Sequence, residues 1–176
     1  LKQIRQTTHK KTLVTAPTGV AAINAGGVTL HSLFQLPFEP YIPGYSTVSL
    51  KKNFFRFSKQ KLDLLRQLEL LIIDEVSMLR ADTLDAIDTT LRIIRRNSHP
   101  FGGIQILYIG DMFQLPPVAK EDEWNLLKEY YQSTFFFEAK VIEQTQPVYL
   151  ELKKVYRQGD PLFVDLLNRI RNNAAT

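Results

Sequence analysis

The feature that most constrains the fold is a short apolar run over residues 68–75 (LELLIIDE), which ends in two adjacent carboxylates, Asp74 and Glu75. A run this short with β-branched members favours a strand buried on both faces over an independent helix. Ionised carboxylates do not belong inside such a strand, so we place them where its C-terminal end emerges. In open α/β sheets this end borders the crevice in which ligands bind. The run therefore predicts a parallel α/β sheet with an acidic ligand site at its edge.

Paired carboxylates at a strand end suit nucleotide hydrolysis at a Walker B-type site. One carboxylate would hold Mg²⁺, directly or through water, and the cation would offset the repulsion between the two side chains. The neighbouring carboxylate would orient or deprotonate an attacking water. The same pair could instead begin a helix, because acidic side chains favour helix N-termini. The pair alone does not decide between the two interpretations.

The remaining composition is that of an ordinary globular protein. The 176 residues are 44% hydrophobic and 23% charged, which is enough for one well-packed domain. The absence of cysteine excludes disulfides and cysteine-based zinc sites. No stretch resembles a membrane span or a signal peptide, so we expect a protein that is not secreted: cytoplasmic in a bacterium, nuclear or mitochondrial in a eukaryote. Because the first residue, Leu1, already lies in a predicted helix over residues 1–8, we expect a fragment of a longer protein.

Positive charge is concentrated in the first third of the chain. Residues 1–62 carry nine Lys or Arg and one acidic residue, a net charge of +8. Residues 63–176 carry thirteen Lys or Arg and seventeen acidic residues, a net charge of −4. In the basic part, aromatic side chains alternate with Lys51, Lys52 and Arg56, which suits base stacking beside phosphate contacts. The aromatic residues are Phe34, Phe38, Tyr41, Tyr45, Phe54, Phe55 and Phe57. Each of them alone could equally be a core or loop anchor.

Predicted strands and helices alternate along the chain, which indicates a parallel, doubly wound sheet. Besides the central run, extended segments are predicted at residues 12–16, 104–109 and 148–152, the second of them buried. Helices are predicted at residues 19–24, 59–67, 80–96, 121–131 and 161–171. The helix over residues 80–96 has one buried face, formed by Leu84, Ile87, Leu91 and Ile94. A loop-rich insertion with three prolines interrupts the pattern at about residues 36–58, and its length suggests a function.

Two further segments lie directly after predicted strands. Residues 16–22 (APTGVAA) form a turn with small side chains whose backbone N–H groups and hydroxyls could grip a phosphodiester backbone. A plain strand-to-helix connection with Thr18 as N-cap is the alternative. In residues 110–117 (GDMFQLPP), the amide of Gln114 could accept from a water and donate to a γ-phosphate at once, and Phe113 could couple that sensing to a base. A simple proline-stiffened turn would explain the second segment equally well.

A third segment, residues 152–158 (LKKVYRQ), contains Arg157. Its planar guanidinium is always charged and suits the charge that develops on a transferring phosphoryl group. A single arginine after an extended segment is also common on an ordinary surface.

In order, the strings APTGVAA with a following Thr-x-His-Ser, LIIDEVSM, GDMFQLPPV and VYRQ resemble the PIF-type and RecD-like DNA helicases. These form the 5′ to 3′ branch of helicase superfamily one, and the resemblance spans about residues 12–158. It implies a RecA-like P-loop NTPase fold over residues 1–35 and 59–176, the first of two such domains in the motor. It also implies that residues 36–58 are a small wedge-like insertion. The parent protein would use ATP to translocate on single-stranded DNA and separate strands.

The resemblance also implies roles for individual residues. Asp74 would be the Mg²⁺ ligand, Glu75 the catalytic base, Gln114 the γ-phosphate sensor and Arg157 a γ-phosphate contact, so all four would bind ATP. Pro17, Thr18, Gly19, His31 and Ser32 would lie along single-stranded DNA. Phe113, Lys51, Lys52 and Arg56 complete the candidate nucleic-acid contacts. Roles in DNA repair, recombination or telomere maintenance are suggested by the family alone.

The 176 residues depart from the family in one respect: they contain no Gly-x-x-x-x-Gly-Lys-Ser/Thr loop. That loop would cradle the phosphates and share the Mg²⁺, and the second RecA-like domain is not recognisable either. We therefore expect this chain, taken alone, to be inert as an ATPase. One alternative is a non-catalytic module, derived from a helicase domain, that binds single-stranded nucleic acid. Another is a different ATPase, such as a clamp loader or signalling NTPase, but this gives no reason for the Pro-Thr-Gly turn.

Overall fold

The computed structural model describes residues 9–47, 50, 56–152, 156 and 159–171. The predicted helix over residues 1–8 lies outside the described residues, as do Phe54 and Phe55. The chain divides into two compact units, residues 1–146 and 147–176, each of which is described by itself.

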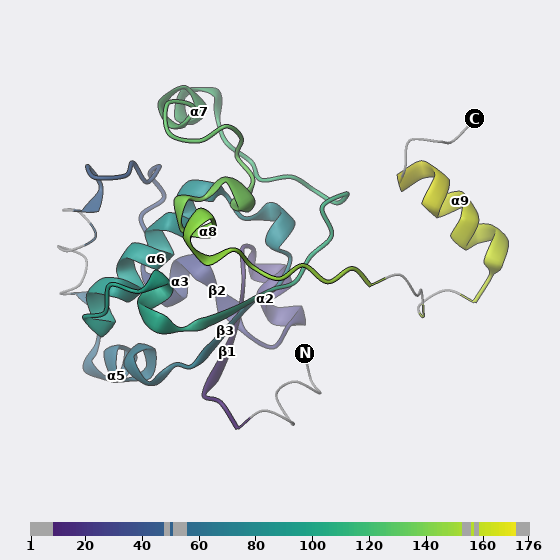
Figure 1. Cartoon of the computed structure of the whole chain (residues 1–176). Coiled ribbons are helices and arrows are strands. Elements are labelled where there is room, and N and C mark those ends of the chain that lie inside the picture. Colours follow the sequence, from purple (N-terminus) through teal and green to yellow (C-terminus); the bar gives the residue numbers. More distant parts are fainter. Residues whose placement is uncertain (1–8, 48–49, 51–55, 153–155, 157–158, 172–176) are drawn as a thin grey trace. The chain divides into compact units, whose positions relative to one another are not determined.

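The first unit is built on a four-stranded parallel sheet in the order β2-β1-β3-β4 (Figure 1). Its strands are β1 (Thr12–Ala16), β2 (Val28–Thr29), β3 (Leu70–Ile73) and β4 (Gln105–Tyr108). The predicted parallel sheet is thereby confirmed, with the acidic pair directly after its most buried strand.

Side chains alternate between the two faces of the sheet. Leu13, Leu71 and Ile106 are in register on one face, and both Leu71 and its neighbour Ile73 are buried in the main core under the helices. The opposite face carries a smaller cluster around Val14, Leu70 and Ile72. The buried hydroxyl of Thr15 donates to the carbonyl of Ile72, 2.9 Å away, which explains a polar residue inside β1.

The prediction that the 104–109 strand is buried was wrong in degree. In β4, Gln105 is exposed and the next three residues are only partly buried. The physical reason is position: among the described strands β4 is at the edge of the sheet and pairs with β3 alone.

Helices flank the sheet (Figure 1). Most of them lie where the sequence predicted a helix, but some of the short ones differ from the prediction in their bounds or were not predicted. The described helices of the first unit are α2 (Gly19–Asn24), α3 (Leu30–Phe34), α5 (Lys59–Gln67), α6 (Ala81–Arg95), α7 (Glu121–Leu127) and α8 (Lys140–Thr145). Short 3-10 turns lie at η2 (Val76–Met78), η3 (Pro100–Gly103) and η4 (Phe136–Glu138). The helix predicted to reach Tyr131 ends at Leu127, and α3 and α8 were not predicted.

The longest helix, α6, organises the core of the first unit. Its predicted apolar face is buried: Leu84, Ile87, Leu91 and Ile94 are at most 2% exposed. Buried Asp85 accepts hydrogen bonds from the Tyr131 hydroxyl and from the backbone N–H groups of Lys140 and Val141, at 2.9–3.0 Å. Burial raises the pKa of Asp85, although these three donors act in the opposite direction. The carboxylate thus fixes the start of α8 against α6.

The first part of the predicted insertion is attached to α6. The N–H of Tyr41 donates to Asp82, 2.9 Å away, and the Tyr41 hydroxyl lies 2.9 Å from that of Thr89. Among the described aromatic residues of the basic segment, Phe34, Tyr41 and Phe57 are core residues, whereas Phe38 and Tyr45 are exposed. The division of the chain into a motor domain and a wedge remains a prediction.

The second unit contains helix α9 (Pro161–Arg171), with the predicted bounds. An ion pair of 2.8 Å joins Arg169 to Asp165 along its surface. Residues 148–152 belong to neither a helix nor a strand. No helix among the described parts of the chain is long and apolar enough to cross a membrane.

Candidate functional site

The acidic pair lies where β3 leaves the sheet. The N–H of Asp74 continues the ladder by donating to the carbonyl of Thr15 at 2.8 Å, and its Oδ1 accepts from the N–H of Glu75 at 3.1 Å. Glu75 has left-handed backbone angles, φ 52° and ψ 44°, and begins η2. A non-glycine residue in this conformation costs on the order of 1 kcal/mol or more, and such strain concentrates at functional sites. The turn directs the chain out of the strand at this carboxylate.

The segment after β4 packs directly against this turn. A Cβ on Gly110 would lie 2.9 Å from the backbone nitrogen of Val76, so only glycine fits here. The following residues form a tight turn in which the N–H groups of Phe113 and Gln114 donate to the side chain and carbonyl of Asp111, at 3.1 and 3.0 Å. The two strand ends therefore approach each other through backbone contacts.

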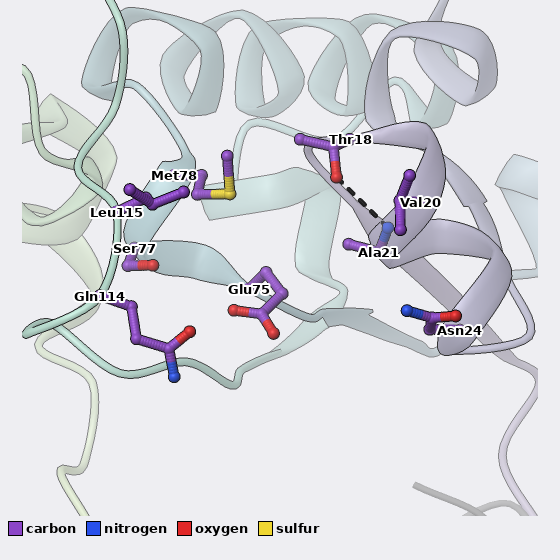
Figure 2. A pocket seen from close by; sticks show the side chains of 9 residues that line it. All are labelled: Thr18, Val20, Ala21, Asn24, Glu75, Ser77, Met78, Gln114 and Leu115. Carbon is purple, nitrogen blue, oxygen red and sulfur yellow. Dashed lines mark hydrogen bonds between the residues drawn. The ribbon is translucent and has the colours of Figure 1, made fainter. Parts of the chain in front are cut away.

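Glu75 and Gln114, which come from different strand ends, line one open cavity of about 230 Å³ (Figure 2). The residues around it are Thr18, Val20, Ala21, Asn24, Glu75, Ser77, Met78, Gln114 and Leu115. Figure 2 shows the carboxylate of Glu75 and the amide of Gln114 extending into the same space. We call this space the carboxylate cavity. The two residues assigned to water activation and phosphate sensing are thus brought together.

Six residues of the carboxylate cavity were given no role from the sequence: Val20, Ala21, Asn24, Ser77, Met78 and Leu115. For Ser77 a signal existed, since it lies two residues after Glu75 in a tight turn. For Asn24 there was none, because it lies at the far end of α2 and reaches the cavity only through the packing of the helix.

The turn between β1 and α2 has the expected cap. The hydroxyl of Thr18 accepts from the N–H of Ala21 at 3.3 Å, so Thr18 is the N-cap of α2 and also lines the carboxylate cavity. A Cβ on Gly19 would meet no described atom within 4 Å. Packing within this unit therefore does not require glycine there, and the open space leaves room for a ligand.

A second open cavity, of about 440 Å³, lies on the other side of this turn. It is lined by Pro17, Thr29, His31, Ser32, Leu36 and Phe38. The rings of His31 and Phe38 are stacked, with centroids 5.5 Å apart and planes at 13°, and Phe38 is 87% exposed. We call this space the aromatic cavity. It collects three of the predicted DNA contacts, Pro17, His31 and Ser32.

Charged groups beside the aromatic cavity fix the state of His31. Burial and the nearby positive charge of Arg80 lower the pKa of His31, and the charge of Asp82 only partly opposes them, so this environment favours the neutral imidazole. Arg80 itself donates to Asp82 twice, at 2.9 Å, and to Glu123 at 2.7 Å. Burial alone would lower the pKa of Arg80, but these two carboxylates raise it. A second cation contacts a residue that lines the aromatic cavity: Lys61 Nζ donates to the carbonyl of Ser32 at 2.6 Å.

The remaining candidate residues are not gathered with these. Phe113 is exposed beside the carboxylate cavity without lining it, and Arg56 is exposed. Lys51, Lys52 and Arg157 lie outside the described residues. Their predicted contacts with DNA and with the γ-phosphate stay predictions.

The parallel sheet, with an Asp-Glu pair after one strand and a polar turn after the next, defines a RecA-like nucleotide-binding fold. Comparison with known sequences identifies the family to which the chain belongs within this class. The family model described as PIF1-like helicase matches residues 1–175, and the chain belongs to that family.

Two curated relatives are both named ATP-dependent DNA helicases. The chain is 39% identical over 163 residues to the ATP-dependent DNA helicase RRM3 of Saccharomyces cerevisiae, a match that covers 93% of this chain and 21% of the relative. It is 34% identical over 165 residues to the human ATP-dependent DNA helicase PIF1, which covers 91% and 23%. The chain thus spans about a fifth of the length of these relatives.

Solved helicase structures share the fold. Bacteroides Pif1 bound to single-stranded DNA superposes with a TM-score of 0.89 at 47% identity, covering 99% of this chain and 39% of the other. The same helicase in complex with ADP-AlF3 and single-stranded DNA gives a TM-score of 0.90, again at 47% identity and with the same coverage. Pif1 of Candida albicans gives 0.79 at 36% identity, covering 99% and 37%.

Proposed function

We propose that this chain is the first RecA-like domain of a DNA helicase that hydrolyses ATP to move 5′ to 3′ along single-stranded DNA and separate strands. The observation that carries the proposal is the turn after β1. Its adjacent residues Pro17 and Thr18 line the aromatic cavity and the carboxylate cavity respectively. A movement of Thr18 caused by nucleotide in the carboxylate cavity would therefore be transmitted to DNA in the aromatic cavity through the peptide bond that joins Thr18 to Pro17.

In the carboxylate cavity, Glu75 and Gln114 would have separate tasks. Glu75 would take the proton of the attacking water, and the amide of Gln114 would hold the γ-phosphate and that water in place. Among the described residues no three metal-ligating side chains cluster together. The donor set still fits Mg²⁺, because this cation is usually held by one or two carboxylates together with waters and substrate phosphates, and Asp74 supplies such a carboxylate. Bound there, Mg²⁺ would neutralise charge on the phosphates.

In the aromatic cavity, stacking would dominate over ionic contact. Burial and Arg80 lower the pKa of His31 and so disfavour its charged form, and its ring together with that of Phe38 offers a flat surface for a base. Ser32 and the turn at Pro17, Thr18 and Gly19 would contact the DNA backbone, with Lys61 beside them as a source of positive charge.

We also propose roles for the residues beyond these cavities. Arg157 would contact the γ-phosphate, Lys51, Lys52 and Arg56 would contact DNA phosphates from a wedge-like insertion over residues 36–58, and Phe113 would contact a base. A second RecA-like domain of the same protein would close over the nucleotide. The proposal includes a role of the whole protein in DNA repair, recombination or telomere maintenance.

The test uses the full-length gene product. We expect Mg²⁺-dependent ATP hydrolysis that single-stranded DNA stimulates, and loss of at least about 100-fold of this activity in Glu75→Gln, because the general base is removed. The control Glu129→Gln changes an exposed carboxylate outside both cavities and should leave the rate unchanged. Duplexes with a 5′ single-stranded tail should be unwound, and those with a 3′ tail should not. Unwinding from the 3′ tail alone would overturn the direction.

A second candidate function is a non-catalytic module that binds single-stranded nucleic acid. The exposed Phe38 stacked on His31 favours it, since this surface needs no nucleotide to bind a base. This candidate predicts salt-dependent oligonucleotide binding that weakens in Phe38→Ala, together with no ATP hydrolysis by the full-length protein.

A further inference from the structure

The buried hydroxyl of Ser77 has no hydrogen-bond partner among the described residues. Ser77 is 0% exposed, and no donor or acceptor lies within reach of its Oγ. An unsatisfied buried polar group costs on the order of 1–3 kcal/mol. Alanine would avoid this cost at the same position, so the hydroxyl indicates a partner that it meets in another state of the protein.

The position of Ser77 narrows the choice of partner. It is the second residue of η2, the turn that Glu75 begins, and it lines the carboxylate cavity together with Glu75 and Gln114. Figure 2 shows its Oγ pointing into the space that the Glu75 carboxylate and the Gln114 amide also face. The backbone of Ser77 is held close to Gly110, at the base of the loop that carries Gln114. Movement of that loop toward η2 would therefore bring the amide to the hydroxyl.

We propose that Ser77 is a positioning residue, whose hydroxyl donates to Oε1 of Gln114 when nucleotide is bound. The inference rests on the proposed ATP hydrolysis. A glutamine amide can turn either its oxygen or its NH₂ group toward a phosphate, and only the NH₂ group can donate to it. With Oε1 held by Ser77, the NH₂ group faces the phosphate.

The alternative partner in the cavity, the carboxylate of Glu75, fits less well. A hydroxyl that donates to a carboxylate stabilises its charged form and so weakens it as a base. Donation to Gln114 leaves the lone pairs of Glu75 available for the attacking water. Ser77 thus acts on the reaction through Gln114 and does not touch the reacting atoms.

The kinetic test uses the full-length protein with saturating single-stranded DNA. We expect Ser77→Ala to lower kcat for ATP about tenfold, the value of one orienting hydrogen bond, with KM for ATP changed less than about twofold. Ser77→Thr keeps the hydroxyl and should restore kcat. The matched control is Ser133→Ala, which removes another buried hydroxyl without a partner, outside both cavities, and should leave kcat unchanged. The melting temperature of Ser77→Ala should not fall, because the hydroxyl has no partner without nucleotide.

A structural test is independent of activity. In the full-length protein with ADP, Mg²⁺ and aluminium fluoride, we expect Ser77 Oγ at about 2.8 Å from Gln114 Oε1. A separation beyond about 4 Å in that complex, or a wild-type kcat in Ser77→Ala, would overturn the proposal. If the wild-type protein hydrolyses no ATP at all, the proposed function fails. If the wild-type protein hydrolyses ATP and Ser77→Ala has the same kcat, only the proposed role of Ser77 fails.

Discussion

At His31, burial and a neighbouring positive charge act in the same direction. Because both lower its pKa in the folded protein, the unfolded chain binds the proton first as pH falls below the ordinary value of about 6.5. The contribution of His31 to stability is therefore expected to fall as the pH is lowered from 7.5 to 5.5. We expect His31→Gln to lose less unfolding free energy over this interval than the unchanged chain, measured by urea denaturation at both pH values. Equal losses would show that the environment of His31 does not disfavour its charge.

A substitution at Asp85 measures how much a buried carboxylate that accepts three hydrogen bonds contributes to the free energy of unfolding. Asp85→Ala would leave the Tyr131 hydroxyl and the N–H groups of Lys140 and Val141 unsatisfied inside the core. We expect it to lower the free energy of unfolding by about 3 kcal/mol. The control Asp63→Ala breaks an exposed ion pair with Arg66 and should cost less than about 0.5 kcal/mol. A loss below about 1 kcal/mol in Asp85→Ala would mean that water replaces the carboxylate.

Glu75 and Gln114 were singled out from the sequence and both line the carboxylate cavity, whereas the chemical roles given to them stay predictions. Asp74, which does not line the cavity, could be singled out together with them because each follows an apolar run, and strand ends meet at one edge of a parallel sheet. The partners of Asp85 lie 46 to 56 residues away along the chain, so no local pattern could reveal a buried carboxylate on α6. Phe38 and Tyr41 have similar neighbours in sequence, yet one is exposed and the other buried.

At the level of elements, the contact between the end of β4 and η2 depends on Gly110. In Gly110→Ala the new Cβ would lie 2.9 Å from the nitrogen of Val76 and 3.2 Å from that of Ser77, and backbone cannot move aside cheaply. We expect a loss of about 1–3 kcal/mol in unfolding free energy, as for other overpacked sites.

The control for this substitution is Gly19→Ala, because a Cβ there meets nothing within 4 Å. Its stability should be unchanged or raised by up to about 1 kcal/mol. Equal effects of the two substitutions in thermal denaturation would contradict the close approach at Gly110.

Sequence patterns predicted the position of most elements but missed the helices α3 and α8. The strand β1 and the helices α2, α5 and α9 have the predicted bounds, and those of α6 differ by one residue at each end. The helix α8 has six residues, as does α2, but its start depends on a hydrogen bond to Asp85, which lies 55 residues earlier in the chain. The burial of β4 was misjudged because the number of neighbouring strands, and not its own composition, determines it.

For the whole molecule, one prediction concerns the 176-residue polypeptide taken alone. Its sequence contains no Gly-x-x-x-x-Gly-Lys-Ser/Thr run, the loop whose lysine balances phosphate charge in P-loop enzymes. We expect the 176-residue polypeptide alone to hydrolyse ATP no faster than its Glu75→Gln variant, with or without single-stranded DNA, in a phosphate-release assay. Robust hydrolysis that needs Mg²⁺ and disappears in Glu75→Gln would refute this.

The division into two units predicts independent stability of the first. All of the largest fully buried side chains of the described residues lie between Leu30 and Phe101. A polypeptide of residues 1–146 should therefore unfold cooperatively, with a free energy within about 0.5 kcal/mol of the 176-residue chain in urea. A loss of the cooperative transition would show that residues 147–176 complete the core.

The edge position of β4 also affects how the polypeptide behaves at high concentration. Its outer backbone groups face away from β3, and Gln105 is the one residue of the strand that is exposed. A half-apolar edge of this kind is a template on which an extended segment of another molecule can add a strand. Expressed alone and concentrated, the chain is thus prone to aggregate edge to edge, and a fused or added strand that covers β4 would keep it monodisperse.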